Sequence, residues 1–215
     1  MPKPPARRSA SQPSTAELRE RVLTATKDLL NDRRFDAISV ADIITAAAVS
    51  RASFYFYFPS KQAVLAELVR RAVNQGQQAA RPWTDGEQDP IDALRSGIAA
   101  GAALWRDNAG VLTAIVEHWG TDEQLRTLWL EQMDQFTDLA VARIHSDPAV
   151  LRHLDGLDVR AIAASLTWLG ERLYYLAAAD VAPFNDQDTL VETLTHAWTR
   201  MLYGSTPGWN GLERL

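Results

Sequence analysis

The stretch that most constrains this 215-residue chain is SVADIITAAAVSRASFYFYFPSK, residues 39–61. Ser39 is a good helix N-cap, and Asp42, three residues later, completes a start of the capping-box type. Ser50 offers a second N-cap after a run of small alanines that lets two helices cross closely. The stretch therefore predicts two short helices joined by a tight turn, the second spanning about residues 51–56. This is the arrangement of a helix-turn-helix.

The second predicted helix carries a dense aromatic run, residues 54–58, followed by Pro59, Ser60 and Lys61. In a helix-turn-helix, exposed side chains of the second helix enter the major groove, and hydroxyl and basic groups reach phosphates or base edges. Lys61 opposes the dipole of the helix that it starts, which a DNA phosphate would explain. Taken alone, a solvated lysine and a plain aromatic core are simpler interpretations. The predicted DNA-binding residues are Ser39, Val40, Ser50, Arg51, Ser53, Phe54, Tyr55, Tyr57 and Lys61.

Charge is divided unequally along the chain. Residues 1–75 contain 12 basic and 7 acidic side chains, whereas residues 76–215 contain 10 basic and 20 acidic ones. This asymmetry fits a basic DNA-reading part joined to an acidic part that DNA repels.

Composition excludes several classes of protein. The chain has no cysteine, so disulfides and cysteine-based metal sites are impossible. No apolar stretch approaches the length of a membrane span, and the N-terminal residues lack a signal-peptide core. We therefore expect a cytoplasmic protein with no membrane partner.

Helical periodicity continues on both sides of the helix-turn-helix. A capping box at Ser14 and Glu17 starts a helix predicted over residues 14–32, and a further helix is predicted from Lys61 to about Gln78. Glycine and proline near residues 76–86 predict a loop and a domain boundary there. The predicted parts are a disordered basic arm at 1–13, a helix-turn-helix domain with its linking helix at 14–78, a helical body at 79–204 and a tail at 205–215.

The sequence SVADIITAAAVSRASFYFYFPSKQAVL, residues 39–65, resembles the N-terminal domain of the TetR family of bacterial transcriptional regulators. The resemblance implies an all-α fold, in which a three-helix helix-turn-helix domain precedes a C-terminal helical domain for ligand binding and dimerisation. It also implies two partners, double-stranded operator DNA and a small effector.

The body is expected to be entirely helical, with helices over residues 91–106, 108–119, 121–146, 149–154, 158–179 and 186–203. The last two are apolar on more than one face, and such a helix is buried on more than one face. A second copy across a two-fold axis is the simplest partner for the extra face. We predict a homodimer through these two helices, which the family resemblance also implies.

Helix-interior glycines and large aromatic residues occur together in the body. Gly97, Gly101 and Gly170 each cost about 1 kcal/mol relative to alanine within a helix. A void beside them, walled by aromatic rings, would suit an apolar or aromatic ligand. Close helix crossing over a filled core is the plainer interpretation of the residues, and the family resemblance favours the pocket. Its predicted lining is Leu94, Gly97, Ile98, Gly101, Trp105, Trp129, Met133, Phe136, Ala140, Thr167, Gly170, Glu171, Tyr174 and Trp198.

Glu171 and Arg172 lie in the most apolar predicted helix, where a buried charge is costly unless it is paired. Neighbours on a helix point about 100° apart. One of the two could therefore face the pocket and the other the dimer interface, or the two could form a salt bridge within or across the dimer.

No catalytic arrangement stands out in the sequence. The four histidines are scattered, and neither a nucleophile elbow nor a phosphate-binding loop is present. We expect no enzymatic activity, no cofactor and no metal site.

Together these features predict a homodimeric DNA-binding regulator, a repressor released from an inverted-repeat operator by a small apolar or aromatic effector. Two alternatives remain at this stage. One is a transcriptional activator. The other is a lipid- or small-molecule-binding carrier or enzyme with an incidental helix-turn-helix.

Overall fold

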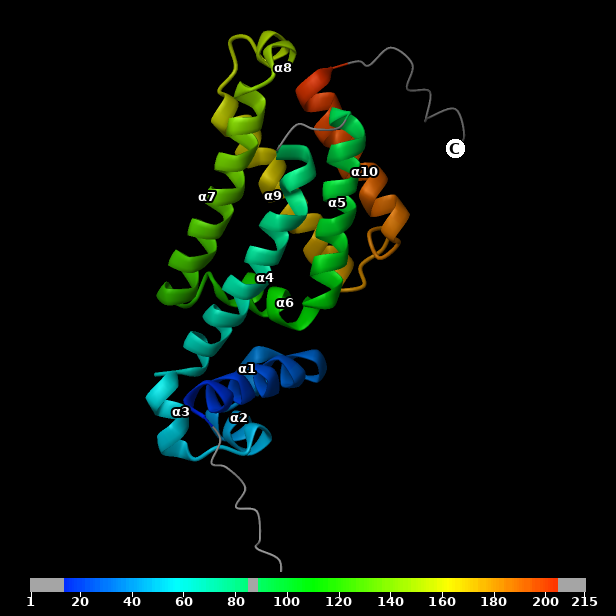
Figure 1. The fold of residues 1–215 in the computed structure, drawn as a ribbon. Coiled ribbons are helices and arrows are strands. Elements are labelled where there is room, and N and C mark those ends of the chain that lie inside the picture. The colour runs from blue at the N-terminus through cyan, green and yellow to red at the C-terminus, as the bar shows by residue number, and fades with distance from the viewer. Residues whose placement is uncertain (1–13, 85–88, 205–215) are drawn as a thin grey trace, which may run out of the picture.

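The computed structural model describes residues 14–84 and 89–204, and every regular element in these two ranges is a helix (Figure 1). The all-α fold class is confirmed. The predicted arm at 1–13 and tail at 205–215 lie outside the described residues. The elements are α1 (Thr15–Asp32), the 3₁₀ helix η1 (Phe35–Ala37), α2 (Val40–Ala47), α3 (Arg51–Tyr57), α4 (Lys61–Thr84), α5 (Pro90–Asp107), α6 (Ala109–His118), α7 (Glu123–His145), α8 (Pro148–His153), α9 (Val159–Ala178) and α10 (Gln187–Tyr203).

Side-chain caps fix where most of these helices start. Ser14 and Ser39 form the capping boxes that the sequence predicts, with Glu17 and Asp42 respectively. Ser50 accepts a hydrogen bond from the Ser53 amide at the start of α3. Each cap satisfies a backbone N–H that has no partner inside the helix. The body helices accordingly begin and end within two residues of their predicted limits.

The predicted end of α4 is wrong. We expected the helix to stop near Gln78 because of Gly76 and Pro82, but it continues to Thr84. Gly76 allows close packing on α5, since a Cβ atom there would lie 2.8 Å from Leu104 Cδ2. Tertiary packing therefore overrides the local breaking tendency. The predicted boundary between residues 78 and 79 falls inside α4, so the head (α1–α3 with the start of α4) and the body (the rest) share this helix.

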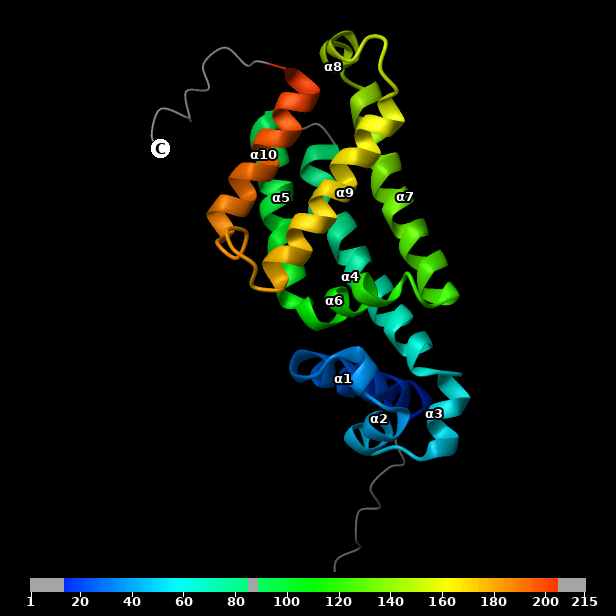
Figure 2. The same cartoon turned by 180° about the vertical axis from the view of Figure 1, so that it is seen from behind.

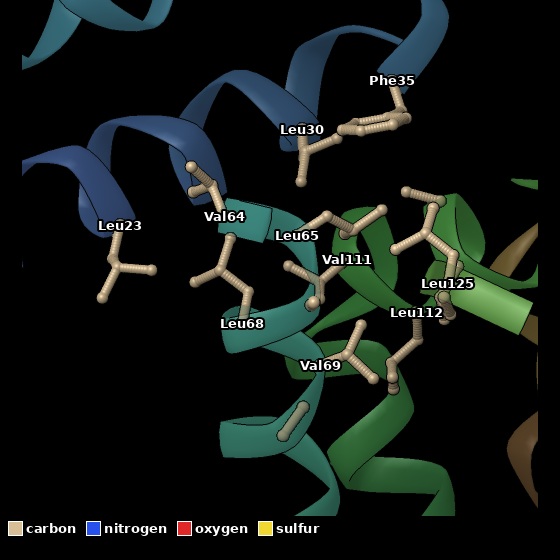
Figure 3. Packing of buried hydrophobic residues seen from close by; sticks show 14 of the residues in the cluster. Leu23, Leu30, Phe35, Val64, Leu65, Leu68, Val69, Val111, Leu112 and Leu125 are labelled. Atoms are coloured by element: carbon tan, nitrogen blue, oxygen red, sulfur yellow. The ribbon is translucent and has the colours of Figure 1, made fainter. Parts of the chain in front are cut away.

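One apolar core joins the head to the body. Val64, Leu65 and Val69 at the start of α4 are fully buried, and the same cluster includes residues of α1 and α6. Figure 3 shows the start of α4 lying between α1 and α6, with Leu65 and Val69 directed toward α6. A second cluster fills the body between α5, α7, α9 and α10. The head and the body are therefore packed against each other through a shared core.

Polar contacts connect α1 and η1 to α6 around this core. Lys27 Nζ donates a hydrogen bond of 2.8 Å to Asn108 Oδ1, and Arg34 pairs with Glu117 at 3.2 Å. The rings of Phe35 and His118 meet edge to face. We call this set of contacts the head–body joint, formed by Lys27, Leu30, Arg34 and Phe35 with Asn108, Gly110, Glu117 and His118.

The closest approach in the joint is at Gly110. A Cβ atom on this residue would lie 2.3 Å from the carbonyl oxygen of Leu30 and 2.6 Å from its carbon. Both are backbone atoms and cannot turn aside, so only glycine permits this spacing of α1 and α6.

No helix within the described ranges combines the length and the apolar character needed to cross a membrane.

Substituting Gly110→Ala should force α1 and α6 apart and lower the free energy of unfolding by about 1–3 kcal/mol, the usual cost of overpacking. The matched control is Gly120→Ala, because a Cβ atom there meets nothing within 4 Å. Urea denaturation of both variants measures the difference. Equal stability of the two variants would show that the joint is not held at this spacing.

Candidate nucleic-acid interface and body cavity

The α2–α3 pair forms a helix-turn-helix at the end of the molecule that is remote from the body (Figure 1). Ala48 ends α2 in the left-handed conformation with φ 49°, and Arg21 donates a 2.9 Å hydrogen bond to its carbonyl. The Ser50 and Ser53 hydroxyls lie 2.8 Å apart at the start of α3. The turn is thus held by contacts within the head and presents α3 in a fixed direction.

The exposed side of α3 carries Arg51 and Tyr55. Tyr55 is 44% exposed, and the Arg51 guanidinium lies over its ring, 5.5 Å from the centroid. The stacking places a guanidinium beside a phenolic hydroxyl, and both groups can contact phosphates and base edges. Of the remaining predicted DNA-binding residues, Ser39 and Ser50 are exposed, while Val40, Ser53 and Tyr57 are half-buried.

Two positions in the aromatic run differ from the prediction. Phe54, whose spacing from Phe58 also predicts a core position, is fully buried and anchors α3 to the head core, so its side chain is not available to DNA. Phe56 is 78% exposed and was left out of the predicted set. The signal was present in the sequence, because a residue two positions from Phe54 lies about 200° around a helix and must point away from the core.

The ammonium group of Lys61 is hydrogen-bonded to backbone carbonyls of the head. Its Nζ donates hydrogen bonds of 2.8 Å to the Phe35 carbonyl and 2.7 Å to the Ile38 carbonyl, and it lies above the Phe35 ring. Burial lowers the pKa of Lys61 more than the nearby carboxylates raise it. These carbonyls offset the unfavourable position of a lysine at a helix start. Lys61 thus already has partners within the head, and its phosphate contact stays a prediction.

A cavity of about 180 Å³ lies in the body between α4, α5, α7, α9 and α10. Every predicted lining residue except Ala140 is on its wall: Leu94, Gly97, Ile98, Gly101, Trp105, Trp129, Met133, Phe136, Thr167, Gly170, Glu171, Tyr174 and Trp198. Ala140 instead packs in the body core, one helical turn beyond Phe136. The prediction missed Val73, Gly76, Leu104, Leu112 and Leu166, in part because α4 was assigned to the head.

The glycines on the wall have different roles. A Cβ atom at Gly97 would meet nothing within 4 Å, so this residue leaves open space. A Cβ atom at Gly101 would lie 2.7 Å from the hydroxyl of Tyr174, so this residue admits a close contact. Tyr174 stacks on Trp105 and donates to the Ile98 carbonyl at 3.1 Å. Burial raises the pKa of Tyr174, which keeps its hydroxyl neutral.

Glu171 brings a carboxyl group into this apolar wall. Burial raises its pKa, and the attraction of Arg172, 3.9 Å away, only partly offsets the effect. Arg172 itself is largely exposed. Glu171 thus lies on the cavity wall and forms a loose ion pair with Arg172, which faces outward, and a place for Arg172 at a dimer interface stays a prediction.

Comparison with known proteins agrees with this geometry. The family described as "Bacterial regulatory proteins, tetR family" matches residues 22–68, and "Transcriptional regulator EthR, C-terminal domain" matches residues 94–204. The chain is 30% identical to the HTH-type transcriptional regulator EthR of Mycolicibacterium smegmatis over 95% of this chain and 94% of that protein. It is 29% identical to EthR of Mycobacterium tuberculosis, over 93% and 94% of the two chains.

A solved structure shares the fold. The putative TetR-family transcriptional regulator of Syntrophomonas wolfei superposes with a TM-score of 0.72 at 17% identity, covering 91% of this chain and 100% of that one.

A helix-turn-helix head on a helical body with an internal cavity defines a DNA-binding transcriptional regulator. This chain belongs to the TetR family, and its body is of the EthR type. Both matched segments are parts of regulators, which supports the regulator prediction over the carrier and enzyme alternatives. Members of the family bind operator DNA and effector ligands and act as dimers. The individual DNA- and ligand-contacting residues remain predictions.

A Lys61→Met substitution should remove the ammonium from the two carbonyls and lower the free energy of unfolding by about 1.5–3 kcal/mol, as expected for hydrogen bonds from a charged group. The control Arg51→Met alters an exposed side chain and should change stability by less than about 0.5 kcal/mol while weakening DNA binding. Denaturation and DNA titrations over a salt series distinguish the two. A Lys61→Met protein of normal stability, with a salt slope reduced by about 0.9 per lost contact, would restore the phosphate interpretation.

Proposed function

We propose that the protein is a homodimeric repressor that an apolar or aromatic effector releases from an inverted-repeat operator in the cytoplasm. The observation that carries this proposal is the position of the cavity. Val73 and Gly76 of α4 line it, and the same helix begins directly after the helix-turn-helix. A ligand in the cavity therefore touches the helix that carries the DNA-reading head.

The proposed DNA contacts come from the exposed side of the head. Arg51, Tyr55 and Phe56 project from α3, where the first two offer polar contacts and Phe56 offers an apolar one to thymine methyl groups. Ser39 lies at the start of α2 and is exposed. The net positive charge of residues 1–75 supplies attraction to the phosphate backbone.

The head–body joint offers a second connection from the cavity to the head. Tyr175, on the same helix as Glu171, donates a 3.3 Å hydrogen bond to Glu117, and Glu117 pairs with Arg34 of the head. A shift of α9 or α4 on ligand binding thus alters contacts that orient the head. A hundredfold loss of DNA affinity requires the ligand to favour the released arrangement by about 2.7 kcal/mol.

The proposed dimer interface lies on α9 and α10. Figure 2 shows these two helices on one side of the body, in front of α4 and α5. Leu169 of α9 and Met201 of α10 are large apolar side chains that remain partly exposed in the single chain. A partner copy would remove this surface from water, and a closed two-fold interface is the simplest arrangement that does so.

The proposed function is tested by measuring the affinity of the protein for DNA from the region upstream of the gene. Fluorescence anisotropy gives this affinity with and without a small neutral aromatic compound such as 4-ethylphenol. Wild-type protein should bind the DNA and lose affinity as the compound is added. Gly97→Phe should fill the open space and abolish the response, whereas Ser96→Phe, a change at the exposed neighbouring position, should retain it. No specific binding to the upstream DNA would overturn the operator proposal, and a normal response of Gly97→Phe would overturn the role of the cavity.

A Met201→Glu substitution should dissociate the dimer, because it places an unpaired charge in the proposed interface. Sedimentation velocity at micromolar concentration measures the change from two copies to one. Thr127→Glu, at an exposed position of α7, serves as the control for added charge. If Met201→Glu sediments as a dimer like the control, the interface lies elsewhere on the molecule.

A further inference from the structure

Two buried polar atoms on the cavity wall have no hydrogen-bond partner among the described residues. They are Oε1 of Glu171 and the indole Nε1 of Trp129, in side chains of residues that are 5% and 3% exposed. Both residues line the cavity. The indole N–H of Trp129 approaches the Glu171 carboxyl as a donor and lowers its pKa, but the two side chains do not reach hydrogen-bond geometry. An unpaired buried group of this kind is destabilising and needs an explanation.

The remaining polar groups of the wall argue against loose packing as that explanation. The Thr167 hydroxyl donates to the Ala163 carbonyl at 2.9 Å, and the Tyr174 hydroxyl donates to the Ile98 carbonyl at 3.1 Å. The hydroxyls of Thr195 and Thr199 are also unpartnered among the described residues, but neither lines the cavity. Among the fully buried side-chain polar atoms of the wall, the missing partners in the described part of the chain are one acceptor and one donor.

We infer that the cavity selects an apolar or aromatic ligand bearing one neutral group that both donates and accepts a hydrogen bond, such as a hydroxyl or an amide, held between Glu171 and Trp129. The ligand O–H donates to Glu171 Oε1, and its oxygen accepts from Trp129 Nε1. This inference rests on the proposed function and adds the chemistry of the effector.

Other ligand groups satisfy only half of the pair. An ether oxygen accepts from Trp129 and leaves Glu171 unpaired, whereas an ammonium group donates to Glu171 and leaves the Trp129 N–H unpaired. A carboxylate would approach the carboxyl group of Glu171 in an apolar cavity within an acidic domain, where like charges repel strongly. A hydroxyl or an amide fits either protonation state of Glu171, since it can donate to a carboxylate or accept from a carboxylic acid.

The size of the cavity sets the scale of a suitable probe. An apolar cavity of roughly 150 Å³ is known to hold benzene, and this cavity measures about 180 Å³. Its wall includes the stacked rings of Trp105 and Tyr174. A benzene ring with one short substituent and one polar group is therefore an appropriate test ligand.

Four para-substituted ethylbenzenes separate the possibilities: 4-ethylphenol, 4-ethyltoluene, 4-ethylanisole and 4-ethylbenzoate. The first two differ by a hydroxyl and a methyl group of similar size, the third accepts without donating, and the fourth is an anion. Their dissociation constants are measured by calorimetry with the full-length protein at pH 7. We expect 4-ethylphenol to bind at least about tenfold more tightly than each of the other three.

Substitutions of Trp129 and Glu171 test whether these two side chains cause the preference for 4-ethylphenol. Trp129→Phe and Glu171→Met should each reduce the phenol-to-toluene affinity ratio toward 1, and Glu171→Gln should preserve most of it because an amide also donates and accepts. Thr195→Val is the matched control, since its hydroxyl is also buried and unpartnered among the described residues but lies off the cavity wall, and the ratio should not change. If a variant fails to fold, the wild-type ligand series decides by itself.

Each outcome of the wild-type series supports or overturns the inference. Equal binding of 4-ethylphenol and 4-ethyltoluene would overturn the polar pair as a ligand site while keeping the cavity. Tighter binding of 4-ethylbenzoate would overturn it in favour of an anion site. Binding of none of the four would overturn both this inference and the effector role of the cavity. Operator binding in the absence of ligand tests the rest of the proposed function separately.

Discussion

The contact on which the rest of this structure depends is the burial of the start of α4 between α1 and α6. Val64, Leu65 and Val69 are inaccessible to solvent because both neighbouring helices cover them. Apolar burial of this kind is the main favourable term in folding, and a close-packed core transmits displacement instead of absorbing it. The head therefore cannot rotate on the body without repacking this core. The closeness of Gly110 to the Leu30 carbonyl makes the same junction sterically tight.

Polar groups inside this molecule differ in whether the chain itself supplies their hydrogen-bond partners. In the head, Lys61 meets the carbonyls of Phe35 and Ile38, so a charge that opposes the helix dipole becomes a clamp between α4 and η1. In the body, Glu171 and Trp129 retain unpaired atoms beside a cavity. The first arrangement is complete within the chain and stabilises it. The second is incomplete within the described residues, and the ligand that we propose would complete it and so link effector recognition to folding stability through mass action.

Two helices, α4 and α9, connect the cavity to the contacts that support the head. α4 contributes wall residues at its middle and core residues at its start. α9 contributes Glu171 to the wall and Tyr175 to the contact with Glu117, whose other partner is Arg34 of the head. Two helices thus touch both the cavity and the support of the head. Coupling between distant sites requires an element whose arrangement both sites bias, and α4 and α9 are the elements with the right contacts.

The sequence by itself determined the helices and the helix-turn-helix, and most of the cavity wall was predicted only with the help of the family resemblance. Capping residues such as Ser14 and Ser39 and the helical periodicity act over three or four residues, so they can be read without the fold. The end of α4, the hydrogen bonds of Lys61 to backbone carbonyls and the position of Ala140 away from the wall were decided only by the tertiary structure. Each depends on residues far away in the chain that fill space or offer a carbonyl at one particular distance. Local patterns carry no information about such partners, because side-chain direction is fixed only to a helix face and the neighbour on that face is chosen by packing.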